Sequence, residues 1–339
     1  MNPLARFASR LLIACAAGFA LAAPAHADGL VGTTFPPGFP NIKDASTGKP
    51  LIGFGAAGAV TRTPVILVHG NNDTPFATAC NPYGNMHELA QDLANRGYRL
   101  SELWGLGYQG DQCDLAVDPT RRSAEPHTAA ANVADLRRFV QAVLRYTHSR
   151  QVDIVGHSLG VIVAREWLRQ DKDAEDQVRR LVAIDGPNHG IINCSPSPLN
   201  YFQQPAFGGF TPDSALCKEL GSPRTPFLKR LNQGRDEIDA DIDVLVIRNA
   251  DTSFVYFANQ DGAFPAVPAI DSFGKPTDFA ESAKLRGAHE KDLTGQGIYD
   301  PFAATAHLGI LNSPDTWKAT FEFLTARRHR HDHDRGHER

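Results

Sequence analysis

The segment from Val152 to Leu168 constrains the fold more than any other part of the chain. The apolar run Val152-Asp153-Ile154-Val155 leads into the pentapeptide Gly156-His157-Ser158-Leu159-Gly160, and a helix-like run follows from Val161. This order predicts a strand, a sharp turn and a helix, in which the two glycines let neighbouring backbone pass close to Ser158. Such a turn lifts a serine hydroxyl clear of its own backbone, where a base can activate it. Ser158 is therefore a candidate nucleophile.

The N-terminus has the features of an export signal. Two arginines precede an apolar stretch from Leu11 to Ala23, and Ala25-His26-Ala27 follows as a cleavage pattern. A lipoprotein signal at Cys15 is the alternative, but only four apolar residues separate Arg10 from that cysteine. We expect a signal peptide over residues 1–27, a mature chain that begins at Asp28, and a secreted protein, extracellular or periplasmic.

Charge and length exclude several classes of function. Without residues 1–27 the chain has 32 Lys and Arg against 38 Asp and Glu, so nothing indicates a nucleic-acid partner. A mature chain of about 310 residues can bury one large core, and no stretch after the signal is apolar for the ~20 residues that span a bilayer. No protein partner is indicated. Residues 327–339 are almost wholly charged with interleaved histidines, and we expect a disordered tail there rather than a metal site.

Four cysteines remain after the signal, since Cys15 lies within it. An even number in an exported chain predicts two disulfides. Of the three possible pairings we favour Cys80–Cys113 with Cys194–Cys217, because each pair brackets one loop-rich segment. Four free buried thiols are the alternative, and export argues against them.

Apolar runs that predict strands alternate with helix-like segments over residues 61–326. Strands are expected at 65–68, 100–108, 152–155, 181–184 and 244–247, with helices between them. This alternation predicts one α/β domain with a mostly parallel sheet and helices on both faces. Residues 28–60 are rich in Gly, Pro and Ala and lack strand or helix periodicity, so we expect an extended lead-in on the surface.

Residues 191–240 interrupt the alternation. They hold Cys194 and Cys217, several Phe and Pro residues, and only a short helical pattern near Phe227–Leu231. Because the segment follows the carboxyl end of a predicted strand, we interpret it as a cap or substrate-binding insertion. A structural excursion without substrate contact is the alternative.

A serine nucleophile needs a base, and that base needs a carboxylate to orient it. In strand–turn–helix sites of this kind the chain order is Ser, acid, His, so the base lies after Ser158. We choose His307, which precedes a short apolar run and a terminal helix at Asp315–Leu324. His289, which lies among charged residues, is the competitor. His189 follows an earlier strand, and a structural hydrogen bond is its expected use.

The remaining site residues follow from the positions of the strands. Asp251 is the preferred acid because it lies just beyond the strand at 244–247, at the end where open α/β sheets gather functional groups. Asp261 is the alternative, although the Asp261-Gly262 pair could equally form a turn. An oxyanion needs two donors, for which we name the backbone N–H groups of Leu159 and of Asn71, in the loop after the first strong strand.

With these residues identified, the chain resembles the α/β-hydrolase superfamily across residues 61–325. More narrowly, it resembles secreted bacterial class 2 lipases and the related extracellular polyhydroxybutyrate depolymerases. The similarity is carried by Thr63–Asn71, Arg96-Gly97-Tyr98 and Gln151–Gly160, and by the short motifs Gly186–Gly190 and His307-Leu308-Gly309. It implies an α/β-hydrolase fold, a triad of Ser158, Asp251 and His307, and Asn71 and Leu159 as oxyanion donors.

The expected activity is that of a secreted serine carboxylic-ester hydrolase, a lipase or esterase, which forms an acyl-enzyme and needs no metal or organic cofactor. Its partner is then an ester substrate, either a lipid or a polyester. Depolymerisation of an extracellular polyhydroxyalkanoate is the alternative, because it uses the same triad. A catalytically inactive binding module is an alternative of another class, against which the presence of Ser, Asp and His at suitable positions argues.

Overall fold

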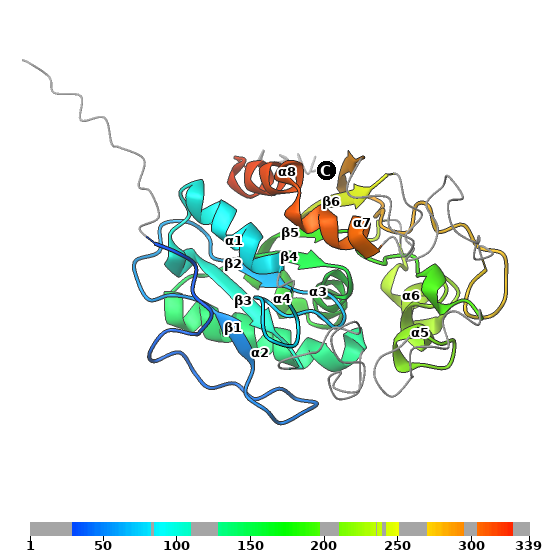
Figure 1. Ribbon diagram of the computed structural model, residues 1–339, viewed down its shortest axis with the longest axis horizontal. Helices are drawn as coiled ribbons and strands as arrows, with labels where there is room; N and C mark the ends of the chain where they lie inside the picture. Colours follow the sequence, from blue (N-terminus) through cyan, green and yellow to red (C-terminus); the bar gives the residue numbers. More distant parts are fainter. Residues whose placement is uncertain are drawn as a thin grey trace, which may run out of the picture.

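A seven-stranded sheet forms the centre of the described part of the chain (Figure 1). The structure is a computed structural model, and it describes residues 29–82, 85–109, 128–196, 210–234, 236–238, 242–250, 270–294 and 304–327. The strand order is β1-β3-β2-β4-β5-β6-β7. Strand β1 runs antiparallel to β3, and every other neighbouring pair is parallel. The expected α/β architecture with a mostly parallel sheet is therefore confirmed.

The strands are β1 Ile52–Phe54, β2 Val65–Val68, β3 Leu103–Gly107, β4 Val152–His157, β5 Val178–Ile184, β6 Asp243–Asn249 and β7 His289–Leu293. The α-helices are α1 Asn85–Asn95, α2 Ala129–Thr147, α3 Leu159–Gln170, α4 Lys172–Gln177, α5 Ala215–Leu220, α6 Pro226–Leu231, α7 Ala304–Gly309 and α8 Pro314–Thr325. Short 3₁₀ turns lie at η1 Leu100–Glu102, η2 Ile192–Cys194 and η5 Ile310–Asn312. No helix of the described residues is both long and apolar enough to span a membrane.

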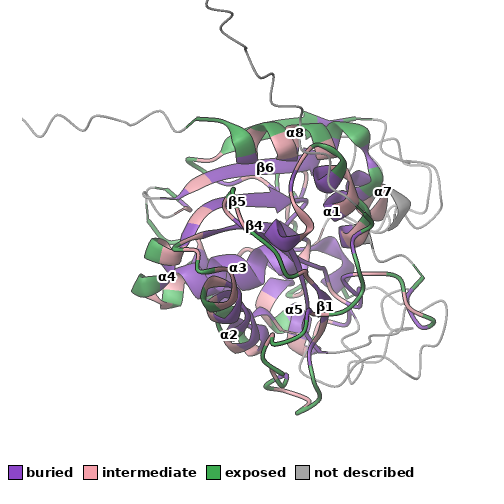
Figure 2. Cartoon of the chain, turned by 90° about the vertical axis from the view of Figure 1, so that its left-hand side faces the viewer, coloured by how far each residue is buried: buried purple, intermediate pink, exposed green. Residues whose placement is uncertain are grey.

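The central strands are buried on both faces, as their unbroken apolar runs predict, and Figure 2 shows β4, β5 and β6 mostly in the colour of buried residues. In β2, Ile66 and Val68 belong to one cluster with side chains of α2 and α3. Val65 and Leu67 point to the opposite face and pack with side chains of α1 and α8. Within the described residues, the sheet is thus enclosed between two helical layers.

Two strands differ from the expected organisation. The lead-in over residues 28–60 contributes β1, which pairs with β3, and its Phe39 ring lies 5.0 Å from Trp104. Strand β7, His289–Leu293, has four exposed residues and is not among the strands expected from the sequence. Its residues alternate in charge and form no apolar run. Its strand conformation is therefore determined by backbone pairing with β6 and not by side-chain burial.

Among the described residues, the structure contains the expected disulfide Cys194–Cys217. It joins η2 to α5 within the insertion at 191–240. Cys80 is also disulfide-bonded, while its expected partner Cys113 lies outside the described residues. The expected signal peptide and the tail after Arg327 also lie outside them.

Glu219 connects the insertion to the N-terminus of α2. Its carboxylate accepts a hydrogen bond from the backbone N–H of Ala129, at 2.7 Å. Burial raises the pKa of Glu219 to about 7, while the backbone N–H groups of Ala129 and Ala130 lower it and the charge of Glu166 raises it. Helix α5 is therefore attached to α2 through a carboxyl group that titrates near neutral pH.

This raised pKa predicts a pH-dependent stability. Because the folded protein holds the Glu219 proton up to about pH 7 and the unfolded chain loses it near the ordinary glutamate pKa of 4.5, the folded state binds more protons between these values. The contribution of Glu219 is full below pH 4.5 and is lost as the pH rises to 7, a change of up to about 3 kcal/mol. Urea unfolding of Glu219→Gln should therefore show a smaller loss of stability than the wild type between pH 5 and pH 8.

Glu88→Gln, an exposed substitution on α1, controls for the loss of one negative charge. Parallel stability curves for Glu219→Gln and the wild type would contradict the assignment.

Candidate active site

Ser158 lies in a strained turn between β4 and α3. Its backbone has φ 53° and ψ −123°, a conformation that serine rarely adopts. The turn is held by backbone hydrogen bonds: the N–H of Ser158 donates to the carbonyl of Ile184 at 3.0 Å, and the N–H of Val161 donates to the carbonyl of Ser158 at 3.1 Å. This is the strand–turn–helix geometry expected for a nucleophile elbow.

The two glycines of the pentapeptide are required by close backbone contacts. A Cβ on Gly160 would lie 2.3 Å from the carbonyl oxygen of Val68, and one on Gly156 would lie 2.9 Å from the backbone nitrogen of Val161. A Cβ on Gly70 would lie 2.9 Å from the Cβ of Ser158. No side chain fits at these three positions. Because the three residues are glycines, the loop after β2 can lie next to Ser158.

The loop after β2 is held by His69 and Tyr108. The Tyr108 hydroxyl donates to the carbonyl of His69 at 2.8 Å, and the two rings are stacked at 4.1 Å. Burial lowers the pKa of His69 to about 4, so its ring is neutral at pH 7, and its Nδ1–H donates to the carbonyl of Gly70 at 2.8 Å. These contacts fix the backbone that precedes Asn71.

Helix α3 begins immediately after Ser158. The backbone N–H of Leu159 is the first of the helix, so it has no acceptor within the helix and points out of its N-terminal end. The helix dipole adds partial positive charge there. Leu159 and Asn71 line the same pocket as Ser158, which places both expected oxyanion donors beside it.

His307, on α7, lies in that pocket and contacts a carboxylate. Its Nδ1–H donates to Oδ2 of Asp185 at 2.7 Å. Its carbonyl accepts a hydrogen bond from Nε2 of His157 at 2.9 Å, and the two rings lie 4.5 Å apart. Burial lowers the pKa of His157 well below its usual range, and the charge of His307 lowers it further. His157 is therefore a neutral ring that holds the backbone of His307.

Asp185 is a site residue that the sequence reasoning did not select. It follows β5 directly, has φ 46°, and accepts hydrogen bonds from both the backbone and the side-chain amide of Asn249, at 3.3 and 3.2 Å. The expected acid, Asp251, and its alternative Asp261 lie outside the described residues. Among the described carboxylates, Asp185 is the one that contacts His307 Nδ1.

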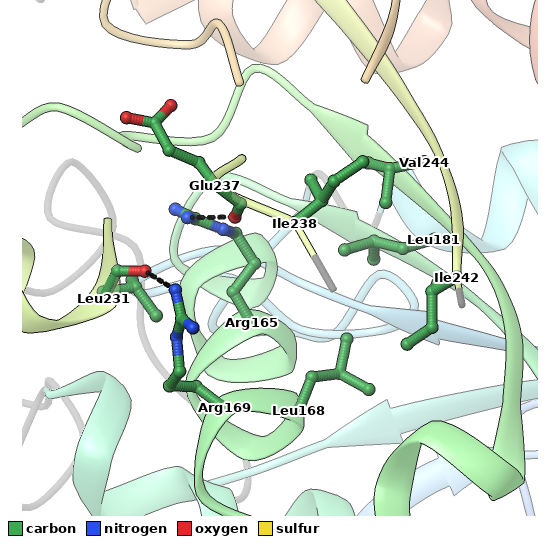
Figure 3. A pocket seen from close by; sticks show the side chains of 9 residues that line it. All are labelled: Arg165, Leu168, Arg169, Leu181, Leu231, Glu237, Ile238, Ile242 and Val244. Carbon is green, nitrogen blue, oxygen red and sulfur yellow. Dashed lines mark hydrogen bonds between the residues drawn. The ribbon is translucent and has the colours of Figure 1, made fainter. Parts of the chain in front are cut away.

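The loop that carries Asp185 is attached to α3 by a buried arginine. Arg165 donates to the side-chain oxygen of Asn188 at 2.9 Å and to the carbonyl of Glu237 at 2.9 Å. Arg169, one turn further along α3, donates to the carbonyl of Leu231 at 3.0 Å (Figure 3). The helix that positions Ser158 therefore also positions the loop of Asp185 and part of the insertion.

The space in the pocket at Ser158, including the part that is open to solvent, has a volume of about 340 Å³. Its lining is mostly apolar. Its walls consist of Asn71, Ser158, Leu159, Pro187, Ile191, Asn193, Phe210, Leu216, Leu220 and His307. Several of these residues belong to the insertion at 191–240, so the described part of that segment contributes to the pocket as a substrate-binding insertion would. Figure 1 shows α5, α6 and α7 together at one side of the sheet.

The other candidate histidines have different surroundings. His289 begins the edge strand β7 and is exposed, with its ring 6.0 Å from that of Phe323. Nε2 of His189 lies 3.1 Å from Oε1 of Glu237, and its Nδ1 lies 3.2 Å from the carbonyl oxygen of Ser282. These are structural contacts of the expected kind. Within the described ranges, no group of three or more His, Cys, Asp or Glu residues is arranged to hold a metal ion.

Comparisons with known proteins concern the family and the fold. The family model described as lipase (class 2) matches residues 62–257, more than half of the chain. The structure resembles a lipase from Bacillus licheniformis in its propeptide form, with 17% sequence identity, a TM-score of 0.53, and coverage of 82% of this chain and 54% of that chain. For the mature form of that lipase the values are 17%, 0.51, 81% and 98%. A comparison with curated proteins gives no match. At this identity the structural likeness concerns the fold.

The close approach of Gly160 to Val68 yields a test of the turn. We expect Gly160→Ala to destabilise the protein by about 3 kcal/mol, because the new Cβ would overlap a backbone carbonyl that cannot move without the sheet. Gly32→Ala is a matched control, since nothing lies within 4 Å of a Cβ at that position. Thermal unfolding of both variants checks the prediction, and equal melting temperatures would contradict the geometry.

Proposed function

Because the chain belongs to the class 2 lipase family and has the α/β-hydrolase fold, we propose that it is a serine carboxylic-ester hydrolase, a lipase or esterase that works through an acyl-enzyme. The observation that carries this proposal is the convergence of Ser158, His307 and the start of α3 on one pocket. We also propose export after removal of residues 1–27, which the disulfide Cys194–Cys217 supports.

In the first half of the reaction, His307 takes the proton of Ser158 while the serine oxygen attacks the ester carbonyl. The carboxylate of Asp185 accepts the Nδ1–H of His307, so it selects the tautomer whose Nε2 can act as a base and stabilises the imidazolium that forms. The developing oxyanion is stabilised by the backbone N–H groups of Leu159 and Asn71. His307 then protonates the leaving alcohol, and the acyl group remains on Ser158.

In the second half, a water molecule replaces the alcohol. His307 takes a proton from this water, the resulting hydroxide attacks the acyl carbonyl, and the carboxylic acid leaves as Ser158 recovers its proton. The neutral rings of His69 and His157 keep additional positive charge away from His307 during both steps. Together, the two half-reactions use the side chains of Ser158, His307 and Asp185, the backbone N–H groups of Leu159 and Asn71, and water.

We propose Asp185 as the orienting acid, with Asp251 as the alternative. Both follow neighbouring parallel strands, since β5 pairs with β6 in the register Ile184↔Ile247. Asn249, two residues before Asp251, already contacts Asp185. The ends of these two strands therefore lie side by side, and the choice between the two aspartates has a direct kinetic consequence.

Substitution of each aspartate separates the two assignments. We expect Asp185→Asn to lower kcat by roughly 10²- to 10⁴-fold, because the amide favours the wrong His307 tautomer and no longer stabilises the imidazolium. Asp251→Asn should lower kcat by less than about 10-fold if Asp185 is the orienting acid. Steady-state hydrolysis of p-nitrophenyl butyrate measures both, and the reverse order would assign the acid to Asp251.

The activity itself is tested with Ser158. Purified protein should hydrolyse p-nitrophenyl esters and react with a fluorophosphonate probe, and Ser158→Ala should lose labelling and more than about 10⁴-fold of its rate. Clearing of triglyceride emulsion with no effect on polyhydroxybutyrate granules supports a lipase, while clearing of the granules alone supports the depolymerase. If the wild type hydrolyses no ester and is not labelled, a binding module without catalysis is left.

A further inference from the structure

Helix α5 has two faces with different surroundings. Leu216 and Leu220, one turn apart, are buried and line the pocket at Ser158. On other sides of the helix, Cys217 forms its disulfide with Cys194, and Glu219 reaches the N-terminus of α2. A six-residue helix is therefore fixed on several sides while it presents two leucines to the reacting group.

Residues next to Cys194, the other half of the disulfide, also line the pocket. These are Ile191, which precedes the turn η2, and Asn193, which lies within it beside Cys194. The backbone N–H of Ile191 donates to the carbonyl of Leu220 at 2.9 Å. Residues 191–194 and α5 are thus joined by a covalent bond and a backbone hydrogen bond, and they form one wall, which we call the α5 wall.

The position of the α5 wall limits the space next to Ser158. Ile191, Leu216 and Leu220 of this wall line the same pocket as Ser158. Ile191, Leu216 and Leu220 offer only hydrocarbon to a ligand, and a polar group placed against them would lose its hydrogen bonds to water. The wall fits an unsubstituted aliphatic chain of limited length.

We propose that the α5 wall is the acyl-binding face of the site, and that Leu216 and Leu220 set the longest linear aliphatic acyl chain that is hydrolysed efficiently. This inference rests on the proposed ester hydrolysis at Ser158. The preferred substrates are esters of short to medium unbranched fatty acids, because the disulfide and the Ile191–Leu220 hydrogen bond prevent the wall from receding. Shortening either leucine opens room for additional methylene groups of the acyl chain.

The test uses p-nitrophenyl butyrate, octanoate and laurate, which share one leaving group. The quantity measured is the ratio of kcat/KM for laurate to that for butyrate, because a ratio is independent of the fraction of protein that is folded. We expect Leu216→Ala and Leu220→Ala to raise this ratio at least 10-fold and Leu216→Phe to lower it, since each added methylene in an apolar pocket changes kcat/KM by about 10-fold. Leu228→Ala is the matched control: this leucine on α6 is buried but does not line the pocket, and its ratio should stay within 2-fold of the wild type.

A second series holds the acyl group at butyrate and lengthens the alcohol from methyl to octyl. We expect the Leu216 and Leu220 variants to leave the ratios of kcat/KM in this alcohol series unchanged. A shift with alcohol length instead of acyl length would overturn the acyl assignment, and unchanged ratios in both series for active leucine variants would overturn the role of the α5 wall. These failures differ from failure of the proposed function, in which the wild type hydrolyses none of the esters.

Discussion

The close approach of the Gly160 backbone to the carbonyl oxygen of Val68, which an added Cβ would meet at 2.3 Å, is the constraint on which the rest of the site depends. Only a residue without a Cβ lets α3 start so close to the end of β2. The approach places the strained Ser158 beside Gly70 and puts the first N–H of α3 in the same pocket as Asn71. The strained backbone of Ser158 is supported by the sheet, because β2 and β4 pair directly and are buried on both faces.

Around this contact, buried groups hold the loops without adding charge. His69 and His157 are both kept neutral by burial, and each uses a ring N–H to bind a backbone carbonyl. His307 is the histidine of this group that faces a carboxylate. Among the described residues, Asp185 is the carboxylate that contacts His307, and Arg165 attaches the loop of Asp185 to the same helix that starts after Ser158.

Much of this arrangement could be predicted from the sequence, and the exceptions have physical reasons. Strands β2, β4, β5 and β6 were predictable because strands buried on both faces are apolar runs, and the turn at Ser158 because its glycines are required. Strand β7 was not, since its charged residues pair through their backbone. Asp185 and Asp251 each follow a strand, so position alone could not show which one reaches His307. Which of the two aspartates contacts His307 depends on how the ends of β5 and β6 are placed relative to α7. The spacing of residues in the sequence does not give this placement.

The central claim is that Ser158 carries the acyl group during ester hydrolysis. Rapid acid quenching of the wild type within the first turnover of p-nitrophenyl butyrate, followed by proteolysis and peptide mass spectrometry, tests it most directly. If Ser158 carries the acyl group, the peptide that contains Ser158 bears a butyryl group. This group forms as p-nitrophenol is released and is lost as butyrate appears. Hydrolysis at full rate with an acyl group on a different residue, or with no acylated peptide at any quench time, would contradict it.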